Sequence, residues 1–191
     1  VVLGRPPLLQ TRVEFPAGLG EFPIEDGNLI MITSAFPGEG KSTCSVNLAI
    51  SIAMEYDSRV LLVDADVAKP SIPTLLGLSP ERGLLDLLID RTVSLSDVLL
   101  KTNVEKLSLL PSGRTHTRAT ELLASDTMAR LLQEMADRYS DRILVFDSPP
   151  LLLSNEARAI ASHMGQIVVV VEAEQTTHAA LKQALATIES C

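Results

Sequence analysis

The chain has 191 residues, and its hydrophobic fraction of 46% is enough for one compact domain with a substantial core. The formal net charge of -8 argues against a general nucleic-acid surface, because phosphate backbones are held by clustered Lys and Arg, so any phosphate site must be local. The longest buried-looking run, IVVVV at 167–171, is well short of the roughly 18 apolar residues that cross a bilayer, and we expect a soluble chain.

Residues 1–27 are rich in Pro and Gly without a clear period, and we expect an irregular arm or linker there. The opening stretch VVLGRPPLLQ lacks an initiator methionine and resembles neither a signal peptide nor a transit peptide, so we expect a fragment of a longer protein. Two cysteines, Cys44 and Cys191, show no CxxC or zinc-ligand spacing, which is typical of a reducing cytoplasm.

From residue 28 onward, short apolar runs alternate with apolar residues at helical spacing. Strands are predicted at 29–33, 59–64, 106–111, 142–150 and 166–172, and the last is expected to be fully buried. Helices are predicted at 42–56, 84–90, 94–100, 119–140, 156–164 and 176–190. Within 119–140, Ser125 or Asp126 could cap a helical restart. This alternation indicates a doubly wound α/β fold, a mostly parallel sheet with helices on both faces.

The loop SAFPGEGKST at 34–43 lies between the first predicted strand and helix. Gly38 and Gly40 let the backbone turn so that successive N–H groups point inward, and the helix adds its positive N-terminal end. Lys41 can reach the β and γ phosphates of a polyphosphate, and Ser42 supplies a hydroxyl that typically completes a magnesium shell. The residues predicted to bind the nucleotide are Pro37, Gly38, Glu39, Gly40, Lys41, Ser42 and Thr43.

Ala35 stands where the usual pattern, G-x-x-x-x-G-K-[ST], has its first glycine. Because this position lies at the edge of the strand, an ordinary β or loop conformation can suffice there. We therefore expect the missing glycine to cost little.

Three acidic residues follow predicted strands, at the edge where parallel sheets bind ligands. VLLVDAD places Asp64 and Asp66 after the second strand, and ILVFD places Asp147 after four apolar residues, the Walker B arrangement. Mg²⁺ prefers oxygen ligands and often keeps several waters, so one carboxylate could hold the ion while another accepts a hydroxyl proton. Paired acids also occur in ordinary exposed turns, and it is their place beside the loop that favours a site.

Three motifs together resemble the bacterial tyrosine kinases of exopolysaccharide loci, within the MinD/ParA-like P-loop group. They are S-x-x-P-G-E-G-K-S at 34–42, VLLVDAD followed by Pro70, and ILVFDSPP at 143–150. The resemblance implies ATP as phosphoryl donor, Mg²⁺, and tyrosines phosphorylated between neighbouring subunits in a C-terminal tail, or a protein substrate in trans. It also implies a membrane protein that governs polysaccharide chain length as partner, and hence a cytoplasmic location at the inner face of the bacterial membrane.

Carried over residue by residue, the resemblance assigns Lys41 to the phosphates. It assigns Ser42, Asp64 and Asp147 to magnesium. Asp66 becomes the leading partner for the incoming tyrosine hydroxyl, although Asp64 could exchange roles with it. The catalytic set implied is thus Lys41, Asp64, Asp66 and Asp147.

The sequence departs from the family pattern in several places. Ala68 stands where an arginine is common, with Lys69 next to it as a substitute. The helix that drives ring assembly in many members is not visible in residues 1–27, so homo-oligomerisation stays open. The two tyrosines, Tyr56 and Tyr139, fall at predicted helix ends and are interpreted as packing or surface residues.

The sequence thus predicts a P-loop kinase domain over 28–191, truncated at its C-terminus, that serves exopolysaccharide synthesis or export. Two alternatives belong to other classes: a MinD/ParA-like ATPase switch and a nonenzymatic nucleotide-dependent regulator, each acting on a membrane partner. Phe36 argues against the switch, because partitioning ATPases carry a lysine there, and the intact Asp64, Asp66 and Asp147 argue against the regulator.

Overall fold

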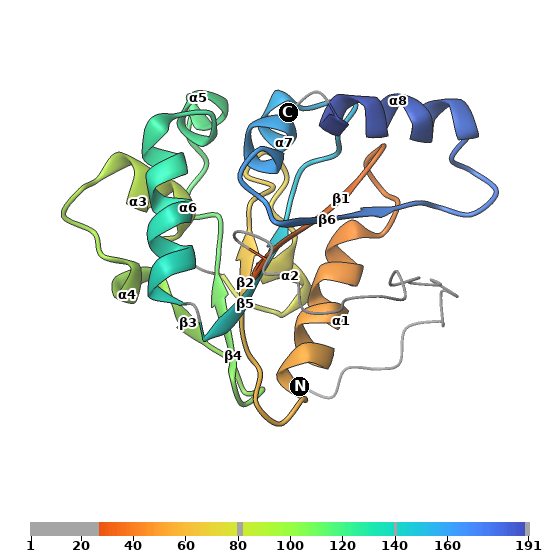
Figure 1. The fold of residues 1–191 in the computed structure, drawn as a ribbon. Coiled ribbons are helices and arrows are strands. Elements are labelled where there is room, and N and C mark those ends of the chain that lie inside the picture. Colours follow the sequence, from red (N-terminus) through yellow and green to blue (C-terminus); the bar gives the residue numbers. More distant parts are fainter. Residues whose placement is uncertain (1–26, 80–81, 140, 190–191) are drawn as a thin grey trace.

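The computed structural model describes residues 27–79, 82–139 and 141–189, so the arm predicted at 1–27 lies, except for Gly27, outside the described residues. Within them a six-stranded sheet runs through the centre of the molecule in the order β3-β4-β2-β5-β1-β6 (Figure 1). Its strands are β1 (Leu29–Ser34), β2 (Arg59–Asp64), β3 (Leu100–Lys101), β4 (Leu107–Leu110), β5 (Arg142–Asp147) and β6 (Gln166–Val170). All neighbouring pairs are parallel except β3 with β4, as predicted for a mostly parallel sheet.

Eight helices in the described residues cover the two faces of the sheet. They are α1 (Lys41–Ala53), α2 (Ile72–Leu75), α3 (Leu84–Ile89), α4 (Leu95–Val98), α5 (Ala119–Leu123), α6 (Asp126–Arg138), α7 (Asn155–Ala161) and α8 (His178–Glu189). Buried residues of α1 and α2 pack on one face, whereas α3 to α8 contribute to the hydrophobic cluster on the other. No helix among the described residues is long and apolar enough to span a membrane.

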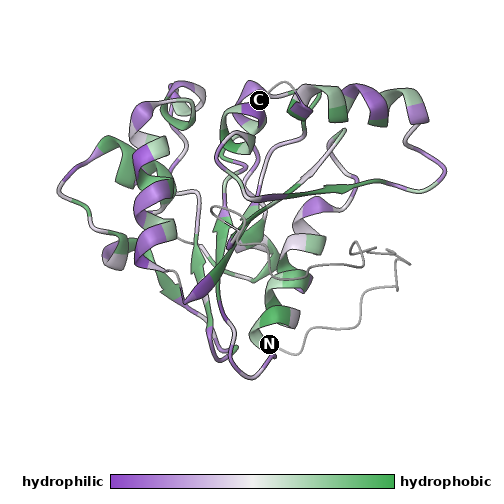
Figure 2. Ribbon diagram, in the orientation of Figure 1, coloured by the Kyte–Doolittle hydropathy of each residue, from purple (hydrophilic) through white to green (hydrophobic). Residues whose placement is uncertain are grey.

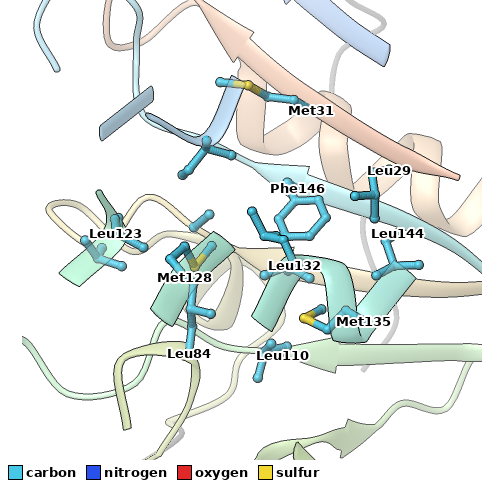
Figure 3. Close-up of a cluster of buried hydrophobic side chains, with 14 of the residues drawn as sticks. Leu29, Met31, Leu84, Leu110, Leu123, Met128, Leu132, Met135, Leu144 and Phe146 are labelled. Carbon is cyan, nitrogen blue, oxygen red and sulfur yellow. The ribbon is translucent and has the colours of Figure 1, made fainter. Parts of the chain in front are cut away.

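The larger hydrophobic cluster shows which side of α6 packs on the sheet, and α6 contributes three large side chains to it. Its Met128, Leu132 and Met135 recur at helical spacing and face Leu144 and Phe146 of β5 (Figure 3). Figure 2 colours much of the rest of α6 hydrophilic, while the central strands are largely hydrophobic. Burial of such side chains contributes roughly 1.5–3 kcal/mol each, so the central strands, and with them their C-terminal ends, are held firmly in place.

Local breaks in the helical pattern fall where polar side chains can cap. The stretch predicted as one interrupted helix at 119–140 divides into α5 and α6, and Ser125 accepts a hydrogen bond from the Met128 N–H at 3.3 Å. Of the two predicted capping residues, Ser125 is therefore the N-cap and Asp126 the first helical residue.

The prediction that strand 166–172 is fully buried is wrong. β6 lies at the edge of the sheet beside β1, and Gln166 to Val169 are only half-buried. The helix predicted at 94–100 is also too long, because it ends at Val98 and Leu100 instead pairs with Leu109 in an antiparallel strand. The short helix α2 was not predicted.

Candidate functional site

The loop between β1 and α1 adopts a conformation that depends on its glycines. Gly38 and Gly40 have φ of 94° and 89°, in the left-handed region that L side chains rarely adopt. Positive φ at a non-glycine residue occurs, among the residues described, at Lys106 and Glu174. Ala35 is therefore not in that region, and its place at the end of the strand does not demand a glycine, as the sequence predicted.

The N-terminus of α1 leaves its backbone donors free of a side-chain cap. Gly40 is the N-cap residue, and the first turn of this 13-residue helix contains no acidic residue. The first N–H groups of a helix have no intrahelical partner and carry the positive end of the helix dipole. Together with the turned loop, they form an anion-binding end of the kind that holds phosphate.

Lys41 forms a buried ion pair with Asp66. The Nζ and Oδ2 atoms are 2.7 Å apart, and the side chains are 10% and 5% exposed. The other oxygen of Asp66, Oδ1, accepts a hydrogen bond from the backbone N–H of Lys69 at 3.1 Å. Lys69 and its neighbour Ala68 are both exposed.

Asp64 and Asp147 lie side by side because their strands are paired in register at that point. Asp64 Oδ2 accepts the Ile72 N–H at 3.2 Å, and Asp147 Oδ1 accepts the Ser45 hydroxyl at 3.1 Å. Burial, followed by the negative charge of Asp147, raises the pKa of Asp64 to about 7. Burial also raises the pKa of Asp147, against the lowering effects of the Lys41 charge and of hydroxyl donors on Ser42 and Ser45.

Two serines join the site that the sequence did not identify. Ser45 Oγ lies near both Asp147 and the Lys41 carbonyl oxygen, 2.9 Å away, and Ser71 Oγ donates to Ser42 Oγ at 2.7 Å. The i, i+4 spacing of Ser45 from Lys41 on α1 was a usable signal. For Ser71 no such signal existed, because its position depends on how the chain turns after β2.

The oxygen atoms near the strand ends suit a hard divalent cation. Asp64 Oδ1 and Asp147 Oδ2 are buried and have no hydrogen-bond partner, an arrangement that is costly unless something else satisfies them. In the described part of the chain no group of three or more His, Cys, Asp and Glu could hold a metal ion by itself. Mg²⁺ is held by one or two carboxylates with water and substrate phosphates, so the residues present fit it.

The remaining predicted loop residues occupy different environments. Pro37, Gly38 and Thr43 are exposed, whereas the carboxylate-bearing Glu39 is buried and bonded to other parts of the chain. The structure thus places two pairs at the start of α1 and the neighbouring strand ends: the ion pair of Lys41 with Asp66, and the strand neighbours Asp64 and Asp147. Ser42, in the first turn of α1, is bonded to Ser71.

Comparisons with known proteins converge on one group. A family described as an AAA domain matches residues 27–191. Over 164 residues the chain is 36% identical to the tyrosine-protein kinase YwqD of Bacillus subtilis, covering 84% of this chain and 68% of that protein. It is 33% identical to the tyrosine-protein kinase ptk of Acinetobacter johnsonii, covering 78% of this chain but only 20% of that longer protein.

A solved structure agrees with these relatives. The kinase domain of the Escherichia coli tyrosine kinase ETK superposes with a TM-score of 0.79 at 28% identity, covering 87% of this chain and 64% of that chain. The strand order, the loop before α1 and the carboxylates at the strand ends therefore occur in a fold shared with kinase domains. These likenesses favour the kinase prediction over the ATPase switch and the nonenzymatic regulator.

Proposed function

The chain belongs to the bacterial tyrosine-protein kinases within the AAA domain family, and from this premise we propose that its site transfers the γ-phosphoryl group of Mg·ATP to a tyrosine hydroxyl. The observation that carries the proposal is the meeting of the Lys41–Asp66 pair and the Asp64–Asp147 pair beside the uncapped start of α1. A plain phosphate-binding loop would not require three buried carboxylates. Phosphoryl transfer requires charge stabilisation together with an acceptor for a hydroxyl proton.

The loop and α1 supply the triphosphate site in this proposal. Backbone N–H groups from Gly38 to Thr43 surround the phosphates, whereas Pro37 has no N–H to donate and only shapes the turn. Lys41 binds the β and γ phosphates. Because Lys41 is paired with Asp66 in the structure, binding of ATP requires its ammonium to exchange that carboxylate for phosphate oxygen, or to share the two. The exchange releases Asp66 for the acceptor, so nucleotide binding prepares the base.

Ser42, Asp64 and Asp147 would hold Mg²⁺, which when bound supplies neutralisation of the phosphate charge. The two partnerless carboxylate oxygens support this assignment. Asp64, whose raised pKa leaves it partly protonated near neutral pH, must be ionised in this role. The hydroxyl of Ser45 donates to Asp147, and the hydroxyl of Ser71 donates to Ser42, so both side chains are fixed by hydrogen bonds.

The reaction itself breaks the bond between the γ phosphorus and its bridging oxygen and forms a bond from that phosphorus to the tyrosine oxygen. ADP leaves with the electron pair, and Asp66 accepts the tyrosine hydroxyl proton, with Asp64 as the residue that could exchange roles with it. Catalysis by the chain consists mainly of positioning and charge stabilisation.

The acceptor and the partners are proposals at the level of the whole protein. We infer a tyrosine-bearing tail of a neighbouring subunit, or a protein in trans, as substrate. A membrane regulator of polysaccharide chain length is the inferred partner, which would hold the domain at the inner face of the bacterial membrane. Exopolysaccharide synthesis or export is the process served.

The test incubates the parent protein with Mg·ATP and a Glu/Tyr copolymer and detects phosphotyrosine, beside Lys41→Met and Asp66→Asn. Lys101→Met is the matched control, since that lysine is exposed on β3, away from the site. We expect phosphotyrosine with the parent and the control, and a loss of at least about a hundredfold with the two site variants. Phosphate release without phosphotyrosine would instead support the ATPase switch.

A further inference from the structure

Glu39 is an unusual residue to find in a loop that binds anions. It lies between the two left-handed glycines, one residue from the start of α1, and is only 5% exposed. A carboxylate there would repel phosphate, and burying it is costly unless both oxygens are bonded. The hydrogen bonds of this side chain explain its presence.

Both carboxylate oxygens of Glu39 have partners. Oε2 accepts the backbone N–H of Phe36, three residues earlier in the same loop, at 2.7 Å. Oε1 accepts the hydroxyl of Thr176, which lies 137 positions later in the sequence. The first bond fixes the loop internally, and the second attaches it to a different part of the chain.

Thr176 belongs to the connection between β6 and α8, which is itself held in a tight turn. The backbone N–H groups of Gln175 and Thr176 both donate to the Glu172 carbonyl, at 3.3 and 3.1 Å, and Glu174 has a positive φ of 66°. Because β6 is the neighbour of β1, this turn lies next to the loop that follows β1 (Figure 1). Thr176 therefore lies in a hydrogen-bonded turn, which supports the loop through Glu39, whereas residues 172–175 of the same turn are exposed.

The sheet order places this support opposite the carboxylates. Asp64 and Asp147 are the last residues of β2 and β5, on one side of β1, whereas Thr176 follows β6 on its other side. The Lys41–Asp66 pair, at the start of α1, thus lies on one side of the loop, and the Glu39–Thr176 hydrogen bond lies on the other.

We propose that the Glu39–Thr176 hydrogen bond holds the loop at 35–40 in its phosphate-binding conformation, which makes both side chains positioning residues for the polyphosphate. The proposal rests on the proposed function only in that the loop binds a polyphosphate. A loop that is already ordered binds its ligand more tightly, because the ordering entropy is not lost on binding. The link acts on affinity and leaves the chemical step to other residues.

The experiment measures dissociation constants of the whole chain for Mg·ATP and for magnesium tripolyphosphate by calorimetry. Thr176→Val removes the hydroxyl at nearly constant volume, and Thr177→Val is the matched control. The Thr177 hydroxyl, just before α8, instead accepts the Ala180 N–H of the first turn of that helix at 3.2 Å and, unlike that of Thr176, is not bonded to Glu39. We expect Thr176→Val to weaken both ligands about tenfold with kcat changed less than twofold, Thr177→Val to leave them unchanged, and Thr176→Ser to restore affinity.

Glu39→Ala removes both bonds and should weaken binding more than Thr176→Val. The double variant should bind no more weakly than Glu39→Ala alone, because the second change then has no partner to remove. If the parent binds Mg·ATP, either of two results would overturn the inference. One is equal affinity of Thr176→Val and the parent, and the other is a double variant whose loss of binding free energy is the sum of the two single losses. Absence of Mg·ATP binding by the parent would instead refute the proposed function. Circular dichroism of each variant separates these losses from unfolding.

Discussion

Replacing Asp64 by Asn should stabilise the protein at alkaline pH when no metal or nucleotide is bound. Asp64 is fully buried, and its pKa is raised from 3.8 to about 7 by burial and by the charge of Asp147, with Asp66 adding to it and Lys41 and the Ile72 N–H opposing it. Since the folded carboxyl holds its proton more tightly than the unfolded one, ionisation works against folding. The ionised carboxylate of Asp64 therefore lowers the free energy of unfolding of the protein.

The sign and size of the effect follow from the two pKa values. Well below pH 3.8 the carboxyl is protonated in both the folded and the unfolded state, and Asp64 costs nothing. As pH rises through the unfolded value, the folded state is progressively penalised, and above the folded value the penalty reaches about 4 kcal/mol at most. Between pH 5 and pH 8 the gain from Asp64→Asn should therefore grow by roughly 2 to 3 kcal/mol.

Urea unfolding at several pH values, in EDTA and without nucleotide, measures this gain. Asp57→Asn is the control, because Asp57 is an exposed carboxylate in the turn after α1. An Asp64→Asn gain that stays constant with pH, or that shrinks as pH rises, would refute the reasoning that burial keeps this carboxyl protonated.

Three further predictions concern other described residues. Ser45→Ala removes a hydroxyl from Asp147, and the magnesium concentration for half-maximal activity should rise about tenfold in a titration of the kinase reaction; an unchanged titration would contradict this. Ser125→Ala should lower the free energy of unfolding by about 1 kcal/mol in urea, through loss of the α6 N-cap, and a neutral result would show that the cap contributes nothing. If the chain phosphorylates itself within residues 27–189, we expect the phosphate on Tyr56, which is 88% exposed. Tyr139 should stay unmodified, because its ring packs against Arg142 and the core. Mass spectrometry locates the phosphate, and phosphate on Tyr139 but not on Tyr56 would contradict the prediction.

The sequence could predict the strand ends of the site because they depend on local pattern. An apolar run that stops at an acid, repeated in two parallel strands, already places Asp64 and Asp147 at one edge of the sheet. The structure adds that they are directly opposite in register. Likewise, Gly38 and Gly40 could be read as turning residues because their φ values require glycine.

Contacts between distant segments could not be predicted in this way. The burial of β6 depends on its place in the strand order, which periodicity does not encode, and its run of valines looked the same as a central strand. The bond from Glu39 to Thr176 depends on that same order. The Lys41–Asp66 pair depends on side-chain directions that emerge only when the loop and the β2 end are packed together.

The central claim is that Lys41 and the carboxylates serve transfer of phosphate to tyrosine. The most direct measurement follows ³²P from the γ position of ATP into phosphotyrosine, with the parent and Lys41→Met assayed side by side. We predict labelled tyrosine with the parent and none above background with Lys41→Met, both proteins being folded. Equal labelling by the two proteins, or labelled inorganic phosphate with no labelled tyrosine from the parent, would contradict the account.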